Sequence, residues 1–315
     1  MKNKNKAFSL IELSIVILII GILVAGVTSG SRLVNASKLQ TAQTVTQSAP
    51  VTSIKGLVLW LETSMEDSFV TGENVDATNI NRWNDRNTQA VYKYYARPAA
   101  ASSAIQFKSA DTAGINSLPS LYFDGSSSSN GFLTLSTASG SAVASPISTP
   151  NNNFTYFVVA KAASTDLSAA NRTVFYNGLV GTNGYGYTIG DNAGSSNYST
   201  RNMIFGDGSG DGSAAENNFA GTITTGAEVV SATYAGGTGG AIFTYVNGTS
   251  AGTDTTSTSA APTTGFYVGA KNSTGGNLWK GYISEIILFD SVLKSSDRKA
   301  VEKYLGKKYA ITVAE

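Results

Sequence analysis

Residues 6–13 read Lys6-Ala7-Phe8-Ser9-Leu10-Ile11-Glu12-Leu13, and they open an apolar run that extends to Val27. Glu12 is the only charged residue between Phe8 and Val27. A charge near the middle of a membrane costs roughly 2.5–3.5 kcal/mol on insertion scales. A simple membrane anchor has no use for such a carboxylate, so Glu12 indicates a specific role for this segment.

An ordinary signal peptide is the alternative interpretation of this segment. Three lysines before residue 7 form a basic n-region, and Leu13 to Val27 can serve as the apolar core. Ala25 offers a cleavage site. Glu12 lies on the apolar side of the boundary between the basic region and the apolar core, and a charge at that place disfavours this interpretation.

The pattern from Lys6 to Leu13 resembles the N-terminal segment of the type IV prepilins and pseudopilins. The family has a short basic leader, a small residue, Phe, and a Ser/Thr-Leu-Ile-Glu-Leu core before a hydrophobic stretch. The resemblance implies that a prepilin peptidase cuts between Ala7 and Phe8, and that Phe8 is then N-methylated. It also implies that Glu12 pairs with the ammonium group of Phe8 during filament assembly, since an apolar bundle tolerates a paired charge. Ala7 stands where the family usually has Gly.

The composition limits the classes of function. Removal of residues 1–7 takes three lysines, leaving 19 basic against 21 acidic residues and a net charge of about −2, with no sign of a nucleic-acid site. No cysteine is present, so no disulfide stabilises the domain. The absence of histidine removes the usual general base and zinc ligand, and leaves carboxylate chemistry.

One continuous helix is expected from Phe8 to about Gln47, with Pro50 ending it. Its first half, to Val27, is about long enough to span a bilayer. Because lysines precede this span, the bulk of the chain should face away from the cytoplasm. The second half keeps an apolar stripe that would lie against the domain or a neighbouring subunit; its members are Leu33, Val34, Leu39, Ala42 and Val45.

Beyond Pro50, runs of β-branched and aromatic residues alternate with Gly, Ser, Thr and Asn, a pattern typical of an all-β sandwich. Asn247-Gly248 predicts a tight hairpin, and Phe154–Val159, apolar on both faces, predicts a central buried strand. The polar stretches Ser126–Ser129 and Thr253–Ser259 are expected to be loops. The expected strands are Gly56–Leu61, Leu121–Phe123, Phe132–Leu135, Phe154–Lys161, Thr173–Tyr176, Tyr185–Ile189, Glu228–Tyr234, Ile242–Val246, Phe266–Gly269 and Gly281–Phe289.

A helix capped by Ser295 or Ser296 and running to about Lys308 should close the chain. Its apolar face would comprise Ala300, Val301, Tyr304 and Leu305.

Five segments in order carry a second resemblance: Gly56–Leu61, Arg82–Asp85, Leu118–Gly125, Phe154–Lys161 and Tyr282–Phe289. Over roughly residues 54 to 311 they are similar to the concanavalin A-like, laminin G-like jelly-roll domains of bacterial surface proteins. The resemblance implies a mainly β protein: a long N-terminal helix, then a two-sheet antiparallel jelly-roll sandwich with a short C-terminal helix. The expected domains are a leader at 1–7, a transmembrane and assembly helix at 8–49, and the jelly roll at 50–315. Such folds often bind sugars on a concave face or loop rim.

Two pairs of residues are candidates for ligand binding. Trp83 and Asp85 could stack on and hydrogen-bond a sugar ring, although a structural role in the core is the favoured alternative. Tyr185 and Tyr187 alternate along a strand and therefore share one face. They form either part of the hydrophobic face or an aromatic platform.

Catalysis is not expected. Glycoside hydrolases of this fold place two carboxylates on alternate positions of one strand. Glu285 and Asp290 are five residues apart, so a regular strand without a bulge sends them to opposite faces. Glu285 is instead expected to be a strand-edge polar residue or a hydrogen-bond anchor.

Calcium is the one cofactor that the sequence suggests. Asp207, Ser209 and Asp211 occupy the first, third and fifth places of a loop, as in an EF-hand. The Glu expected at the twelfth place is missing, which favours a flexible surface loop.

The sequence therefore predicts a type IV pilin-like filament subunit that displays a lectin-like sandwich, with a role in adhesion. Its expected partners are like or related pilins, a prepilin peptidase, a pilus assembly platform and a carbohydrate ligand. It would lie in the inner membrane before assembly and then in a periplasmic or cell-surface filament of a bacterium. The alternatives are a pseudopilin of a type II secretion system, or a membrane-anchored glycan-binding or glycan-cleaving protein.

Overall fold

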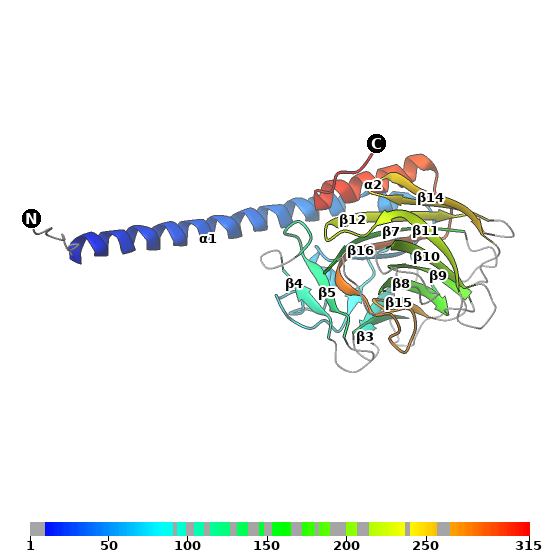
Figure 1. The fold of residues 1–315 in the computed structure, drawn as a ribbon, viewed down its shortest axis with the longest axis horizontal. Helices are drawn as coiled ribbons and strands as arrows, with labels where there is room; N and C mark the ends of the chain where they lie inside the picture. The colour runs from blue at the N-terminus through cyan, green and yellow to red at the C-terminus, as the bar shows by residue number, and fades with distance from the viewer. Residues whose placement is uncertain are drawn as a thin grey trace, which may run out of the picture.

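A computed structural model describes residues 10–90, 93–98, 104–109, 114–126, 131–137, 145–147, 153–164, 172–179, 183–189, 200–206, 214–236, 240–256 and 265–315. A long helix projects from a β-sandwich, with the N-terminus at its far end (Figure 1). This helix, α1, spans Leu10–Gln47 without interruption, as the sequence predicts, and a short 3-10 helix η1 (Pro50–Ser53) follows it. The predicted start at Phe8 lies outside the described residues.

Two antiparallel sheets make up the domain, and we name them sheet A and sheet B. In sheet A, β7 and β16 are central, and β1 (Leu57–Glu62) also pairs with β16. Apart from β1, the strands of sheet A in spatial order are β14 (Thr249–Thr256), β13 (Gly240–Val246), β12 (Ala227–Tyr234), β7 (Phe154–Ala162), β16 (Lys280–Phe289), β5 (Ser120–Asp124) and β4 (Gln106–Lys108). Sheet B runs β11 (Ala214–Thr222), β10 (Thr200–Gly206), β9 (Asn183–Ile189), β8 (Arg172–Leu179), β15 (Phe266–Val268), β6 (Leu133–Thr137), β3 (Tyr94–Pro98) and β2 (Trp83–Asn84).

All ten predicted strands are confirmed within a few residues of their expected bounds. Strands β2, β3, β4, β10, β11 and β14 were not predicted. The expectation of a loop at Thr253–Ser259 is wrong for its first half, because Thr253–Thr256 belongs to β14 and pairs with β13. Polar β-branched residues such as Thr suit an edge strand, where one backbone side faces a neighbour and the side chains face water.

Sheet A is buried on both faces at its centre. In β7, Tyr156 and Val158 belong to the core between the sheets, whereas Phe157 and Val159 belong to a second cluster under the helices. Successive side chains of a strand point to opposite faces. The prediction that Phe154–Val159 is a central buried strand is therefore confirmed, and its apolar residues serve two separate cores.

The closing helix α2 (Ser295–Tyr309) packs on the outer face of sheet A beside the end of α1 (Figure 1). Its predicted extent is confirmed, and Val301, Tyr304 and Leu305 are buried as expected, but Ala300 is exposed. The predicted cap is wrong. Lys294 occupies the N-cap position and makes no side-chain cap hydrogen bond.

The apolar stripe of the second half of α1 is divided along its length. Ala42 is buried against the domain, and Leu39 and Val45 are half-buried. Leu33 and Val34 lie nearer the apolar half and are 73% and 55% exposed. The sandwich therefore covers the end of the stripe and leaves its beginning free.

The predicted hairpin at Asn247-Gly248 connects β13 and β14. Asn247 and Gly248 have φ values of 50° and 76°, in the left-handed region that this turn requires. Gly248 also lies close to the C-terminal segment: an added Cβ would be 2.7 Å from both the Ala314 carbonyl oxygen and Val313 Cγ1.

We expect Gly248→Ala to lower the free energy of unfolding by about 1–3 kcal/mol, because it combines left-handed strain with overpacking. Gly72→Ala is the matched control, since Gly72 has φ 92° and open space around its Cβ position. Thermal unfolding of the full chain in detergent would measure both. Equal losses for the two variants would contradict the proposed contact with the C-terminal segment.

Candidate functional site

The N-terminal segment is exposed along its whole apolar length. Glu12 lies in the first turn of α1, and the large apolar side chains of residues 10–27 are each at least half exposed. This helix is long and apolar enough to cross a membrane. Ala7 and Phe8, the predicted processing residues, lie outside the described residues.

Trp83 and Asp85 lie in the interior, so the favoured structural role describes them and the alternative of a sugar-binding surface is wrong. Trp83 is fully buried, and its Nε1–H donates to the Glu62 carbonyl oxygen at 2.7 Å. Asp85 Oδ1 accepts from the backbone N–H groups of Trp60 and Asn87, at 2.9 and 2.8 Å. Burial raises the pKa of Asp85 from 3.8 to about 6, although these hydrogen bonds oppose the rise.

Tyr185 and Tyr187 are also in the core, and neither is available as a surface platform. Their exposed fractions are 0% and 2%. The Tyr185 ring stacks on Phe154, with ring centroids 3.6 Å apart. Of the two alternatives that the sequence left open, they form part of the hydrophobic face of the sheet.

The calcium candidates Asp207, Ser209 and Asp211 lie outside the described residues. Within the described ranges, no group of three acidic side chains is arranged to hold a metal ion.

A buried ionic cluster lies between sheet A and α2. Glu62 of β1 and Glu285 of β16 are directly opposite each other in the strand register. Lys308 of α2 lies between them, and its Nζ is 2.9 Å from Glu62 Oε2 and 2.9 Å from Glu285 Oε2. All three side chains have no exposed surface. We name these three residues the ionic junction.

Neutral donors satisfy the remaining oxygens of both carboxylates. Glu285 accepts hydrogen bonds from Trp60 Nε1 at 2.7 Å, Tyr304 OH at 2.8 Å and Tyr309 OH at 2.9 Å. Glu62 accepts from the Ser64 and Ser68 hydroxyls, each at 2.6 Å. A buried charge is tolerated only when it is paired and hydrogen-bonded, and both conditions hold here.

The ionisation of the junction follows from these contacts. Burial alone raises the pKa of Glu62, but the charge of Lys308 and the two serine hydroxyls outweigh it and lower the pKa from 4.5 to about 2. Burial alone lowers the pKa of Lys308, whereas the charges of Glu285 and Glu62 raise it, and the net change is upward. Glu62 and Lys308 are therefore both charged at neutral pH.

The junction also reaches the end of α1. Tyr304 OH lies 3.5 Å from Thr46 Oγ1, and Thr46 Oγ1 lies 3.4 Å from Ser64 Oγ. Gln43 Nε2 donates to the Ser64 carbonyl oxygen at 3.0 Å. The last turns of α1 are thus fixed to the residues that surround Glu62.

Sequence reasoning identified Glu285 as a hydrogen-bond anchor, which is confirmed, but β16 is a central strand and not an edge. The register of β16 against β7 shifts between Ile283 and Glu285, and this bulge places Glu285 under α2. Asp290 is exposed beyond the end of β16. The sequence analysis did not predict that Glu62 and Lys308 pair with Glu285. The available signals were the charge of Glu62 at the end of an apolar strand and the charge of Lys308 on the buried face of a helix.

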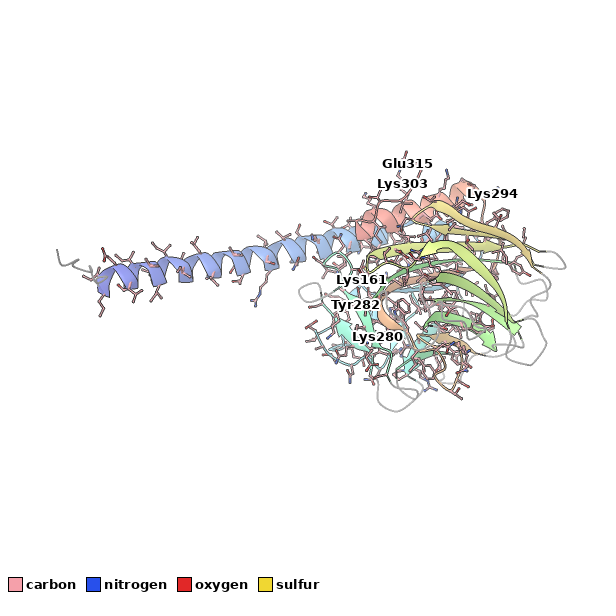
Figure 2. All side chains as sticks on the ribbon, viewed as in Figure 1. Lys161, Lys280, Tyr282, Lys294, Lys303 and Glu315 are labelled. Atoms are coloured by element: carbon pink, nitrogen blue, oxygen red, sulfur yellow. The ribbon has the colours of Figure 1, made fainter. Side chains whose placement is uncertain are left out.

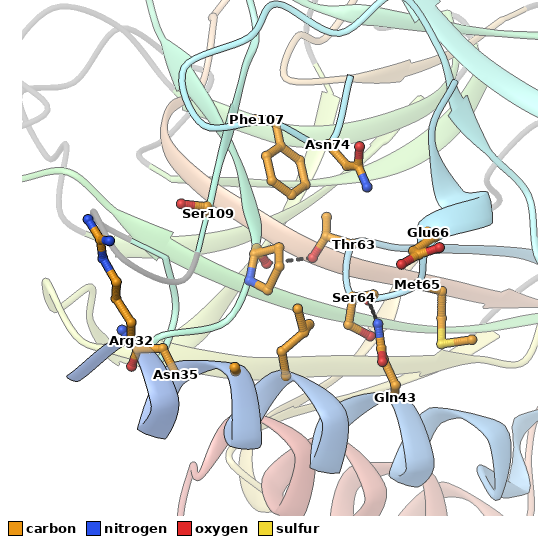
Figure 3. Close-up of a pocket in the computed structure, with 13 residues that line it drawn as sticks. Arg32, Asn35, Gln43, Thr63, Ser64, Met65, Glu66, Asn74, Phe107 and Ser109 are labelled. Atoms are coloured by element: carbon orange, nitrogen blue, oxygen red, sulfur yellow. Dashed lines mark hydrogen bonds between the residues drawn. The ribbon is translucent and has the colours of Figure 1, made fainter. Parts of the chain in front are cut away.

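A pocket of about 250 Å³ lies between α1 and the loops at the near end of the sandwich (Figure 3). The buried residues Thr63, Ser64 and Phe107 are among those that line it. Arg32 and Asn35 of α1 form one wall, opposite Glu66 and Asn74 of the domain. The pocket combines polar groups with an aromatic ring and adjoins α1.

Comparison with known proteins separates the two parts of the chain. Residues 2–28 match the family model for the prokaryotic N-terminal methylation motif, so the N-terminus carries the prepilin pattern. No curated protein sequence matches the chain.

The sandwich is similar to solved receptor-binding domains of toxins. The binding domain of botulinum neurotoxin serotype D/C has a TM-score of 0.53 at 11% identity, over 79% of this chain and 52% of that one. The binding domain of botulinum neurotoxin DC in complex with SialylT has a TM-score of 0.53 at 10% identity, over 79% and 51%. Botulinum neurotoxin type C, whose cell entry depends on interaction with two ganglioside molecules, has a TM-score of 0.53 at 11% identity, also over 79% and 51%. This chain spans about half the length of these domains, and at such identities the likeness shows the fold alone.

Removal of the cation from the ionic junction should be strongly destabilising. Lys308→Ala leaves Glu285 without its counter-ion and leaves Glu62 with only the more distant Arg86, whose Nε is 3.8 Å from Glu62 Oε1, and we expect a loss of about 3–5 kcal/mol in the free energy of unfolding. Lys307→Ala, at the exposed neighbouring position, should change it by less than about 0.5 kcal/mol. Denaturant unfolding of the full chain in detergent measures both, and a small loss for Lys308→Ala would contradict the role of the junction.

The two shifted carboxyl groups give opposite dependences of stability on pH. Because the folded-state pKa of Glu62 is lowered, its contribution is present above about pH 4.5 and is lost as the pH falls towards about 2. The raised pKa of Asp85 means that its contribution is lost as the pH rises from 3.8 to about 6.

We therefore expect Glu62→Gln to flatten the fall in stability below pH 4.5, and Asp85→Asn to flatten the fall between pH 4 and 6. Glu315→Gln is the control, since its carboxylate is 91% exposed. Melting temperatures measured across this pH range would test the assignment. Identical profiles for wild type and both buried-site variants would contradict it.

Proposed function

We propose that this protein is a type IV pilin-like filament subunit, cleaved by a prepilin peptidase between Ala7 and Phe8. The observation that supports this most strongly is the coincidence of two features at the N-terminus. The methylation motif at residues 2–28 coincides with a helix whose apolar half does not pack on its own domain. Such a surface needs either lipid or neighbouring helices around it.

Assembly would transfer that surface from lipid to a bundle of like helices. The basic leader precedes the span, so the sandwich would face away from the cytoplasm and end on the filament surface. Glu12 would pair with the ammonium group of a neighbouring Phe8, because a lone charge in an apolar bundle is expensive. The partners would be like or related pilins, the peptidase and an assembly platform in the inner membrane.

The ionic junction supports the same proposal from the other end of α1. A filament subunit transmits load between its helix and its displayed domain, so the two need a fixed orientation. Thr46 and Gln43 are tied to the residues around Glu62, and α2 packs beside them. We assign residues 8–49 to the assembly helix and 50–315 to the displayed domain.

The displayed sandwich would bind carbohydrate and give the filament a role in adhesion. Support comes from the fold, which it shares with toxin domains that interact with gangliosides or bind SialylT. A purely structural filament subunit and a pseudopilin of a type II secretion system are the alternatives within the same processing pathway. A glycan-cleaving enzyme is disfavoured because Glu285 is buried and its oxygens are occupied by four donors. Calcium at Asp207, Ser209 and Asp211 remains a proposal.

The test uses sheared surface filaments from cells that express the full chain. Intact mass and N-terminal sequencing should give a chain that begins at Phe8 and is methylated. Recovery of an unprocessed chain, or of none, from the filament fraction would contradict the proposal.

Glu12→Ala should leave cleavage intact and lower incorporation into filaments by about tenfold or more, since the amine of Phe8 loses its partner. Ser14→Ala is the control on the same helix, because the Ser14 hydroxyl bonds locally to the Ile11 carbonyl oxygen at 2.8 Å. Immunoblots of membrane and filament fractions measure both steps. Normal incorporation of Glu12→Ala would contradict the assigned role of Glu12.

A further inference from the structure

Part of the outer face of sheet A is left uncovered by the two helices, and two tyrosines lie there. Tyr122 of β5 and Tyr282 of β16 are directly opposite each other in the strand register. Their ring centroids are 5.0 Å apart, with an interplanar angle of 43°. Both side chains are partly exposed, in contrast to Tyr185 and Tyr187 of the core.

Lysines surround this pair. Lys161 of β7 is opposite Tyr282, and its Nζ lies 5.6 Å from the centre of that ring. Lys108 of β4 approaches Tyr122 in the same way, at 5.9 Å. Lys280 is exposed two residues before Tyr282, and Figure 2 shows Lys161, Lys280 and Tyr282 close together on one side of the sandwich. We name these five residues the tyrosine–lysine surface.

The positive charge of this surface is only partly offset by its surroundings, because Asp124 is the one acidic residue opposite these lysines in the described strand register. Lys108, Lys161 and Lys280 form no salt bridge with another residue in the part of the chain that the structure describes. Asp124 lies opposite Lys280 in the register, but its carboxylate accepts hydrogen bonds from the Ser126 N–H at 2.9 Å and hydroxyl at 2.5 Å. The surface is therefore cationic.

The rings are held in place before any ligand arrives. Tyr282 packs against the apolar cluster under the helices, and Tyr122 is fixed by its cross-strand neighbour. Burial and the proximity of Tyr122 raise the pKa of Tyr282, so its hydroxyl stays uncharged at physiological pH and adds no negative charge to the surface. Such preorganisation reduces the entropy cost of binding.

A purely structural role explains only part of the arrangement. A cross-strand aromatic pair stabilises a sheet by a few tenths of a kcal/mol to about 1 kcal/mol. Three lysines with only Asp124 as an acidic neighbour on the same face, and with no salt bridge to it, leave an excess of positive charge whose repulsion adds no stability. Aromatic rings flanked by positive charges are instead suited to a ligand that has apolar ring faces and carries negative charge.

We propose that the tyrosine–lysine surface binds an anionic glycan, with sugar rings against Tyr122 and Tyr282 and sugar carboxylates or sulfates at the three lysines. A chain of uronic acids carries one carboxylate on each ring, so it presents apolar ring faces and negative charges together. The inference rests on the part of the proposed function that makes the sandwich a carbohydrate-binding module. It adds the location of the site and the charge of the ligand.

The experiment measures binding of the full chain, in neutral detergent micelles, to three oligosaccharide probes of matched length. Polygalacturonate and heparin-derived oligosaccharides are the anionic probes, and dextran is the neutral one. The wild-type protein should bind at least one anionic probe and not dextran, and affinity should fall as salt rises because the contacts are exposed charges.

Variants then assign the site. Lys161→Gln and Lys280→Gln should each weaken binding by about threefold to tenfold, and the double variant by more. Tyr282→Phe should keep the affinity, since it keeps the ring, whereas Tyr282→Ala and Tyr122→Ala should lose about tenfold. Lys294→Gln, at an exposed lysine before α2, is the control and should behave as wild type. Melting temperatures confirm that each variant folds.

Four results would overturn the inference: no binding of either anionic probe, equal binding of dextran, unchanged affinity in the double lysine variant, or binding of anionic lipid vesicles without glycan binding. If dextran binds, and the tyrosine variants bind it with the affinity of the wild type, the sandwich is a carbohydrate-binding module whose site lies elsewhere. Filament recovery is scored separately. A chain absent from filaments that still binds the anionic probe would contradict the filament role and leave this site standing.

Discussion

The ammonium group of Lys308 lies between two carboxylates with no access to water, and the relative placement of helix and sandwich depends on it. Glu62 and Glu285 face each other across two paired strands, where their repulsion would be severe without a cation between them. The cation comes from α2, so α2 must lie on this part of sheet A. Tyr304, on the same helix, reaches both Glu285 and Thr46, and the end of α1 is fixed by the same set of contacts. Such an arrangement contributes less to net stability than to orientation, because desolvation offsets much of the ion-pair energy.

Sheet A consequently carries three different surfaces. Its inner face packs on sheet B, its outer face is covered by the helices over the central strands, and the remainder of the outer face shows the tyrosine–lysine surface. The bulge near Ser284 lets Tyr282 and Glu285 share the outer face although they are three residues apart. A single strand thus contributes to both the junction with the assembly helix and the proposed glycan site.

The limits of sequence-based prediction are physical. Long apolar or β-branched runs such as Phe154–Lys161 could be identified because both faces are buried and the pattern is continuous. Strands β11 and β14 consist mostly of small and polar residues, and β10 has only a short apolar run at Met203–Phe205, so their pairing is decided by neighbouring strands. The exposure of aromatic residues could not be predicted from the sequence: Tyr185 and Tyr282 both follow a glycine in a predicted strand, but Tyr185 is in the core and Tyr282 is partly exposed.

The sequence by itself determined the N-terminal motif, the continuous apolar helix and the mainly β character of the rest, since each is a local pattern of charge or hydrophobicity. For Glu285 it left two roles open, a strand-edge polar residue or a hydrogen-bond anchor. Only the tertiary structure decided that Glu285 pairs with Lys308, that Glu62 shares the same cation, and that Tyr122 and Tyr282 meet. These contacts join residues far apart in the chain, and their proximity depends on strand order and register, which no local pattern specifies.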